Sequence, residues 1–149
     1  MILTAACSGI KESPTDGPEN ASTVQAVSVI DGADDERSES QLAQSIRVGD
    51  NGPRFPACAY LGHVSGVGQH DLLDVYGAPF ECANVIDNLA NGRELYVCSN
   101  SMDRKWFGVV YAGKGQSSSE CGLDAPIRLA REYAGPCKSG WVSSAFVRP

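Results

Sequence analysis

The sequence predicts an all-β domain, and three observations lead to that fold class. From Phe55 to the C-terminus, short apolar segments alternate with Gly, Pro, Asn and Ser turns, at the close spacing typical of a small barrel or sandwich. No segment in that range has convincing helical periodicity. The six cysteines are widely spaced, without a Cys-x-x-Cys pair, which favours a disulfide framework in an oxidising compartment.

The first seven residues, MILTAAC, resemble the end of a bacterial lipoprotein signal peptide. In such a lipobox a signal peptidase cuts before a cysteine that becomes lipid-modified, and here Ala5-Ala6 precedes Cys7. Thr4 stands where a bulky residue is usual, with Leu3 before it. A signal peptide needs about 15–30 residues, so a start codon placed too far downstream would explain the missing part. The alternative is a frayed N-terminus with an incidental cysteine.

Residues 8–55 are predicted to form an acidic, flexible and disordered linker. They hold nine acidic and four basic residues, which gives −5 of the chain's formal −6. Low hydrophobicity with net negative charge is typical of disorder. Residues 23–30 (TVQAVSVI) are a candidate strand, and residues 39–48 a candidate short helix with Leu42 and Ile46 at near-helical spacing. No part of the chain has the basic surface of a nucleic-acid binder.

The domain is predicted to span residues 56–149, with strands bounded by turn signals such as Gly77-Ala78-Pro79 and Asn91-Gly92. The predicted strands are residues 58–67, 71–76, 84–89, 93–98, 106–111 and 138–142. Residues 112–136 lack periodicity and are predicted to be a long inserted loop. Residues 143–146 are predicted to form a tight turn before a final strand residue, Val147.

The two central strands have the clearest patterns. In residues 93–98 (RELYVC), Leu95 and Val97 should face one side of the sheet, and the alternate residues Tyr96 and Cys98 the other. Residues 106–111 (WFGVVY) are aromatic and β-branched almost throughout, as strands prefer.

Several of these stretches together resemble a bacterial SH3 (SH3b) domain. That family has a strand ending in a Val-Arg-Ser-Gly-Pro-like turn, then a Val-Ile-x-x-Leu strand. A glycine turn with an x-Val-x-Val strand, a Trp-Tyr/Phe-x-Val strand and a closing Gly-Trp-Val-Ser-Ser-x-Tyr/Phe-Leu/Val follow. The corresponding stretches here are residues 73–79, 85–89, 91–98, 106–109 and 140–147. The resemblance covers residues 58–149 and implies a small SH3-like barrel with residues 112–136 inserted. Tyr76-Gly77 departs from the Arg-Ser that the family often has, in the turn that shapes the ligand groove of some members.

The closing motif also makes physical sense in a barrel. Gly140 would let the backbone pass close to a neighbouring strand. Trp141 is predicted to cover the open end of the barrel, where a large aromatic ring buries much area and can still use its N–H. Ser143-Ser144 suit a tight 3₁₀ turn before the last strand.

Two disulfides are predicted among the five cysteines of the domain. Cys121 and Cys137 flank the inserted loop, and a bond between them would close that loop. Cys58 and Cys98 both lie in predicted strands and form the second pair. Cys82 is then left over as a buried small residue or a free thiol, and exchanging it for Cys58 is the alternative pairing.

No catalytic residue, metal site or cofactor is predicted. His63 and His70 are the only histidines, and they precede every domain cysteine except Cys58, so no oriented Cys–His nucleophile pair is suggested. The glycines of residues 62–68 (GHVSGVG) have the wrong spacing for a nucleotide loop. Zinc knuckles need close ligand pairs, which these cysteines do not supply.

Ligand contacts are instead predicted at aromatic side chains: Tyr76, Tyr111, Tyr133 and Trp141, for each of which core packing is the competing role. The SH3b resemblance implies a monomeric, non-enzymatic binding module of the bacterial cell envelope. It would be an exported, periplasmic lipoprotein, anchored to the membrane through Cys7, that recognises peptidoglycan or an envelope protein through a shallow groove beside the inserted loop. The alternative is an inhibitor or protein-interaction lipoprotein whose disulfide-closed loop, residues 121–137, docks into a partner.

Overall fold

Residues Gln41–Pro149 form one compact unit. The computed structural model describes residues 43–149, so the lipobox at Cys7, the candidate strand 23–30 and most of the predicted linker lie outside the described residues. The described part is all-β, as predicted: residues 43–149 form nine strands in two antiparallel sheets, with two short 3₁₀ helices and no α-helix.

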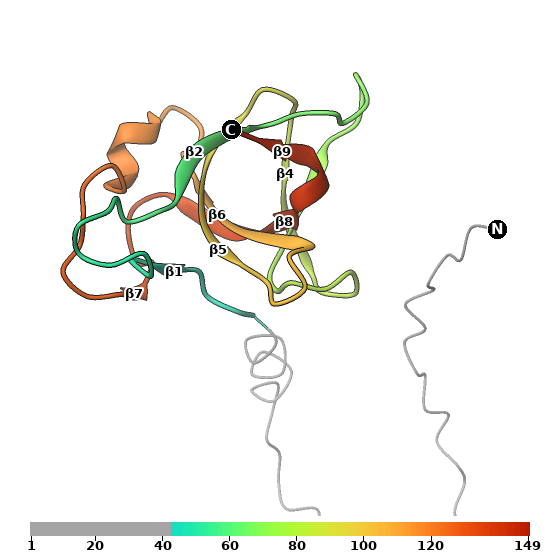
Figure 1. Ribbon diagram of the computed structural model, residues 1–149. Coiled ribbons are helices and arrows are strands. Elements are labelled where there is room, and N and C mark those ends of the chain that lie inside the picture. Colours follow the sequence, from blue (N-terminus) through green and yellow to red (C-terminus); the bar gives the residue numbers. More distant parts are fainter. Residues whose placement is uncertain (1–42) are drawn as a thin grey trace, which may run out of the picture. The chain divides into compact units, whose positions relative to one another are not determined.

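Seven strands form the main sheet, and they curve round a common interior (Figure 1). In sheet order they are β4 (Val85–Leu89), β3 (Leu73–Tyr76), β8 (Lys138–Ser143), β6 (Trp106–Tyr111), β5 (Glu94–Asn100), β2 (Tyr60–Val64) and β9 (Val147–Arg148). No backbone ladder joins the end strands β4 and β9 in this sheet. Closure into an SH3-like barrel therefore stays a prediction.

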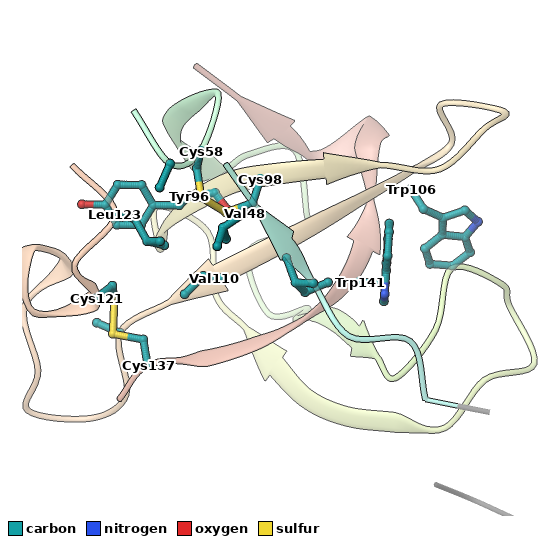
Figure 2. Packing of buried hydrophobic residues seen from close by; sticks show 13 residues of the cluster. Val48, Cys58, Tyr96, Cys98, Trp106, Val110, Cys121, Leu123, Cys137 and Trp141 are labelled. Atoms are coloured by element: carbon teal, nitrogen blue, oxygen red, sulfur yellow. A yellow bond between two sulfur atoms is a disulfide. The ribbon is translucent and has the colours of Figure 1, made fainter. Parts of the chain in front are cut away.

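Both faces of the central strands are buried, which gives the domain two cores. Leu95 and Val97 of β5 belong to the inner cluster, and Tyr96 and Cys98 to the outer one, as the alternation predicted. The inner cluster lies inside the curved sheet and consists of Val64, Leu73, Val75, Leu89, Leu95, Val97, Val109, Tyr111, Val142 and Val147. The outer cluster, which Figure 2 shows, is covered by the segment before β2 and by the inserted segment.

The N-terminal boundary of the fold differs from the prediction. Residues 43–55 belong to the compact unit, not to a linker, and residues 43–48 contain β1 (Arg47–Val48) where a short helix was expected. Ile46 and Val48 are 1% and 2% exposed, because side chains two residues apart on an extended chain point the same way. Burying each contributes about 1.5–3 kcal/mol, which outweighs the weak local preference for a helix.

The inserted segment is more regular than predicted. It contains a 3₁₀ helix, η1 (Ser118–Cys121), and β7 (Arg131–Glu132), which pairs with β1 to form the second sheet. The predicted tight turn before the last strand is confirmed as a second 3₁₀ helix, η2 (Ser144–Phe146).

The closing motif is partly corrected. A β-carbon on Gly140 would collide with Val75 of β3, so the close approach expected at this glycine is confirmed. Trp141, however, does not cover an open end. It belongs to the outer cluster, only 2% exposed, and its Nε1 donates a hydrogen bond to the carbonyl oxygen of Gln44 at 2.8 Å. The ring is buried because the N-terminal segment, predicted to be linker, crosses this side of the domain.

Candidate ligand-binding site

Both predicted disulfides are confirmed. Cys58 lies just before β2 and Cys98 in β5, and these strands pair, so the two side chains meet on the outer face. Cys121 ends η1 and Cys137 directly precedes β8, and their bond closes the inserted loop. The alternative in which Cys82 replaces Cys58 is wrong.

Cys82 was predicted to be a buried small residue or a free thiol, and both predictions are wrong. It is exposed, not buried, in the turn between β3 and β4. It is disulfide-bonded, not a free thiol. The remaining cysteine of the sequence, Cys7, lies outside the described residues.

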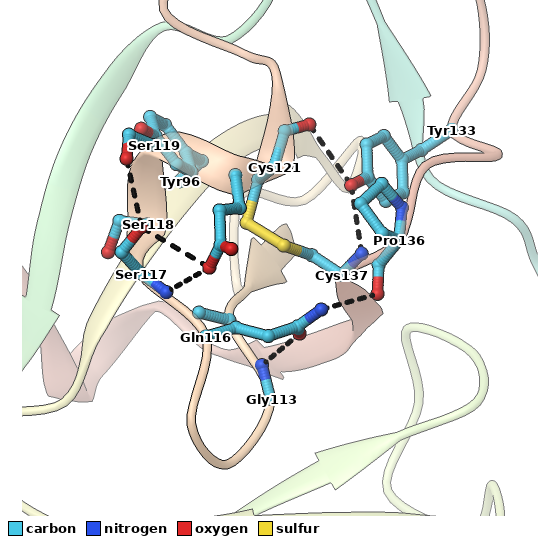
Figure 3. The surroundings of a disulfide bond; sticks show 12 residues. Tyr96, Gly113, Gln116, Ser117, Ser118, Ser119, Cys121, Tyr133, Pro136 and Cys137 are labelled. Atoms are coloured by element: carbon cyan, nitrogen blue, oxygen red, sulfur yellow. Dashed lines mark hydrogen bonds between the residues drawn. A yellow bond between two sulfur atoms is a disulfide. The ribbon is translucent and has the colours of Figure 1, made fainter.

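Hydrogen bonds stabilise the chain on either side of the disulfide that closes the loop (Figure 3). The Tyr133 hydroxyl donates to the carbonyl oxygen of Cys121 at 3.1 Å and accepts from the backbone N–H of Cys137 at 3.2 Å. The Gln116 amide accepts from the N–H of Gly113 and donates to the carbonyl oxygen of Pro136. Tyr133 therefore supports the loop, and its hydroxyl is already engaged.

The structure does not bring the four predicted ligand aromatics together. Tyr76 is half-buried and packs edge-on against Trp106, with ring centroids 5.1 Å apart. Tyr111 and Trp141 are each 2% exposed and lie in different cores. Each of the two instead borders a different hollow of the surface.

We call the larger one the polar hollow. It has a volume of about 430 Å³ and is lined by Gln44, Ser45, Arg47, Asp50, Asn51, Ala59, Val97, Cys98, Ser99, Asn100, Glu132 and Trp141. Arg47 and Asp50 form an ion pair at 3.4 Å, and the Ser99 hydroxyl donates to the carbonyl oxygen of Arg47. Within the described part of the chain, the exposed side chains of Asn51, Asn100 and Glu132 make no hydrogen bond.

We call the second one the basic hollow. It has a volume of about 240 Å³ and is lined by Leu72, Asp87, Asn88, Leu89, Ala90, Arg93, Tyr111, Ala112, Gly113, Lys114 and Lys138. Three cations and one carboxylate give it a net charge of +2. The Tyr111 hydroxyl and the Lys138 ammonium both donate to Oδ2 of Asp87, each at 2.9 Å.

This network accounts for two perturbed ionisations. The hydrogen bond from Lys138 is the main cause that lowers the pKa of Asp87, and the Tyr111 hydroxyl adds to it. Burial, followed by the hydrogen bond to Asp87, raises the pKa of Tyr111. At neutral pH, Asp87 is therefore an anion and Tyr111 a neutral donor, so Asp87 cancels part of the positive charge of the hollow.

The histidines take part in neither hollow. His63 on β2 and His70 in the following loop are both exposed. Among residues 43–149 no group of three His, Cys, Asp or Glu side chains is placed to hold a metal ion. In the same range no helix is long and apolar enough to cross a membrane.

Comparison of the chain with protein-family models, with curated proteins and with solved structures found no match. The two hollows and the disulfide-closed loop are the features of residues 43–149 that bear on function. Sequence reasoning missed most of their polar residues. Gln44 to Asn51 fell in the predicted linker, where only the spacing of Ile46 and Val48 could have signalled a buried strand.

Proposed function

We propose that residues 43–149 form a non-enzymatic binding module of the bacterial cell envelope, and that it recognises the glycan of peptidoglycan. Three features support this: the order of SH3b-like motifs, the two disulfides, and the polar hollow. The polar hollow carries the proposal, because it is the larger concave site and collects side chains that can both donate and accept hydrogen bonds.

The chemistry of the polar hollow suits neutral sugars. Side-chain amides such as those of Asn51 and Asn100 can pair with neighbouring sugar hydroxyls as donor and acceptor at once. Arg47, Asp50 and Glu132 give the hollow a net charge of −1, which disfavours strongly anionic polymers. Since Asn51 and Asn100 make no bond within the described part of the chain, a sugar would not have to break one.

We expect purified sacculi to retain the protein at low salt and the Asn51→Ala/Asn100→Ala variant to bind roughly tenfold more weakly. Two lost hydrogen bonds, each contributing about 0.5–1.5 kcal/mol, account for a change of that size. The measurement is a pull-down with quantified bound fraction. Gln69→Ala, which removes an exposed amide from the loop between β2 and β3, is the matched control and should bind as wild type. Failure of the wild type to bind, or equal binding by the double variant, would contradict the proposal.

The second candidate function is capture of an envelope protein by the disulfide-closed loop. Leu129 on this loop is 79% exposed, between the exposed Arg128 and Arg131. Ile127 is unsuitable as a probe because it packs against the outer cluster. Leu129→Ser should abolish capture of such a partner and leave sacculus binding unchanged, whereas the asparagine double variant should do the reverse.

We propose export, because disulfides persist in oxidising compartments. Lipid attachment to Cys7 remains the proposed anchor and has a specific competitor. Cys82 is disulfide-bonded, and Cys7 is the one other cysteine of the sequence that lies outside the two bonds described above. A sulfur in a lipid thioether cannot also form a disulfide. A diacylglycerol mass on the Cys7 peptide is the expected result of anchoring, and a Cys7–Cys82 peptide in a non-reduced digest would contradict it.

A further inference from the structure

We propose that the basic hollow is a second binding site, which takes the terminal carboxylate of a short peptide with small apolar side chains. This site is separate from the polar hollow and does not depend on sugar recognition there. The two hollows have no lining residue in common.

The charge of the basic hollow is the first argument. It is +2 on a chain whose formal net charge is −6, and Asp87 is the only carboxylate that lines it. A local excess of positive charge attracts an anion, while the negative charge on the rest of the protein repels it.

Donors remain available to such an anion. Arg93 uses its Nη2 to donate to the carbonyl oxygens of Ala112 and Gly113, which leaves the N–H groups of Nε and Nη1. The Lys138 ammonium gives one donor to Asp87 and keeps two. Lys114 forms no hydrogen bond or ion pair with the rest of residues 43–149, so all its donors are available. A carboxylate between Lys114 and Lys138 would receive charge-assisted hydrogen bonds from both.

The size and floor of the basic hollow define what carries the carboxylate. Its volume, about 240 Å³, suits one or two small residues and is far too small for a folded partner. Leu72, Leu89, Ala90 and Ala112 contribute apolar surface, and Leu72 is 54% exposed. A small apolar side chain next to the carboxylate would cover this surface. An inorganic anion would leave the surface exposed to water.

The fold holds the site in place before any ligand arrives. Lys138 follows Cys137 directly, so the disulfide to Cys121 fixes the start of β8. The bonds from Arg93 hold the chain at Ala112 and Gly113, next to Lys114. A preorganised site loses less entropy on binding than a mobile one.

The test is a titration of the isotope-labelled full chain with N-acetyl-alanyl-alanine, followed by amide NMR signals. We expect shifts at Leu89, Ala112 and Lys114, and weaker binding at high salt. The C-terminal amide of the same dipeptide should bind at least fivefold more weakly. Lys114→Gln should weaken binding of the acid roughly fivefold, the effect of one exposed charge pair. Lys105→Gln removes the same charge from the turn before β6, at the other end of that strand, and should have no effect.

Several outcomes would overturn the proposal. These are no shifts at millimolar dipeptide, equal binding of the acid and its amide, and equal losses in the two lysine variants. Inorganic phosphate that binds as well as the dipeptide would reject the peptide carboxylate in favour of a simple anion site. Each of these results leaves sacculus binding through Asn51 and Asn100 untouched, so the two proposals fail separately.

Discussion

Replacing Cys58 and Cys98 together by alanine is expected to lower the free energy of unfolding by about 4 kcal/mol. The bond joins residues 40 apart in the chain, so its loss releases a long loop in the unfolded state. Both cysteines are also buried, at 2% and 8% exposure, so the alanines leave small gaps in the outer cluster. Urea denaturation of wild type and variant, both without reductant, measures the difference.

The Cys121→Ala/Cys137→Ala variant is the matched control for this prediction. Its bond spans only 16 residues, so the chain-entropy argument gives a smaller loss, about 3 kcal/mol. This variant should also weaken peptide binding in the basic hollow, because Lys138 loses its fixed neighbour. A larger loss for the short loop than for the long one would contradict the chain-entropy account of both bonds.

Trp141→Ala is expected to destabilise the domain by about 3–5 kcal/mol, as large aromatic truncations in cores do. The ring is 2% exposed, and its N–H holds the carbonyl oxygen of Gln44, so truncation removes packing and releases the N-terminal segment together. Faster hydrogen exchange at the amides of Ile46 and Val48 should accompany the loss of stability. Thermal or urea denaturation measures the first effect, and amide NMR the second.

Trp141→Phe separates the two contributions of this side chain. It keeps most of the apolar ring but removes the N–H donor, so the expected loss is about 1–3 kcal/mol, below that of alanine. The prediction would be contradicted if Trp141→Ala lowered the free energy of unfolding by less than about 1 kcal/mol and left amide hydrogen exchange at Ile46 unchanged. The ring would then not hold the N-terminal segment in place.

Much of the strand layout follows from local information, which explains why it could be predicted. The alternation in residues 93–98 reports the two faces of β5 because side chains on a strand point to opposite sides in turn. Asn91-Gly92 marks the turn before that strand, where Gly92 has a φ of +80° that glycine adopts readily. The loop disulfide was predictable because Cys121 and Cys137 flank one unpatterned stretch.

The candidate sites were far less predictable, since their members are distant in sequence. Gln44 and Asn51 meet Glu132 because β1 pairs with β7, and they meet Asn100 because β1 also lies against β5. Likewise, Asp87 lies within reach of Tyr111 and Lys138 only after β4, β6 and β8 take their places in one sheet. No periodicity or motif in the sequence indicates such contacts between distant residues.

The all-β class, most strand positions and the Cys58–Cys98 and Cys121–Cys137 disulfides could be predicted from the sequence, because each depends on patterns within a few residues or on cysteine placement. Only the tertiary structure decided which faces are buried. The segments before β2 and around the loop disulfide cover the outer face of the sheet, so Trp141 lies beneath chain that the composition alone had predicted to be linker. Burial is a property of what packs against a residue, and here that partner lies 97 residues away.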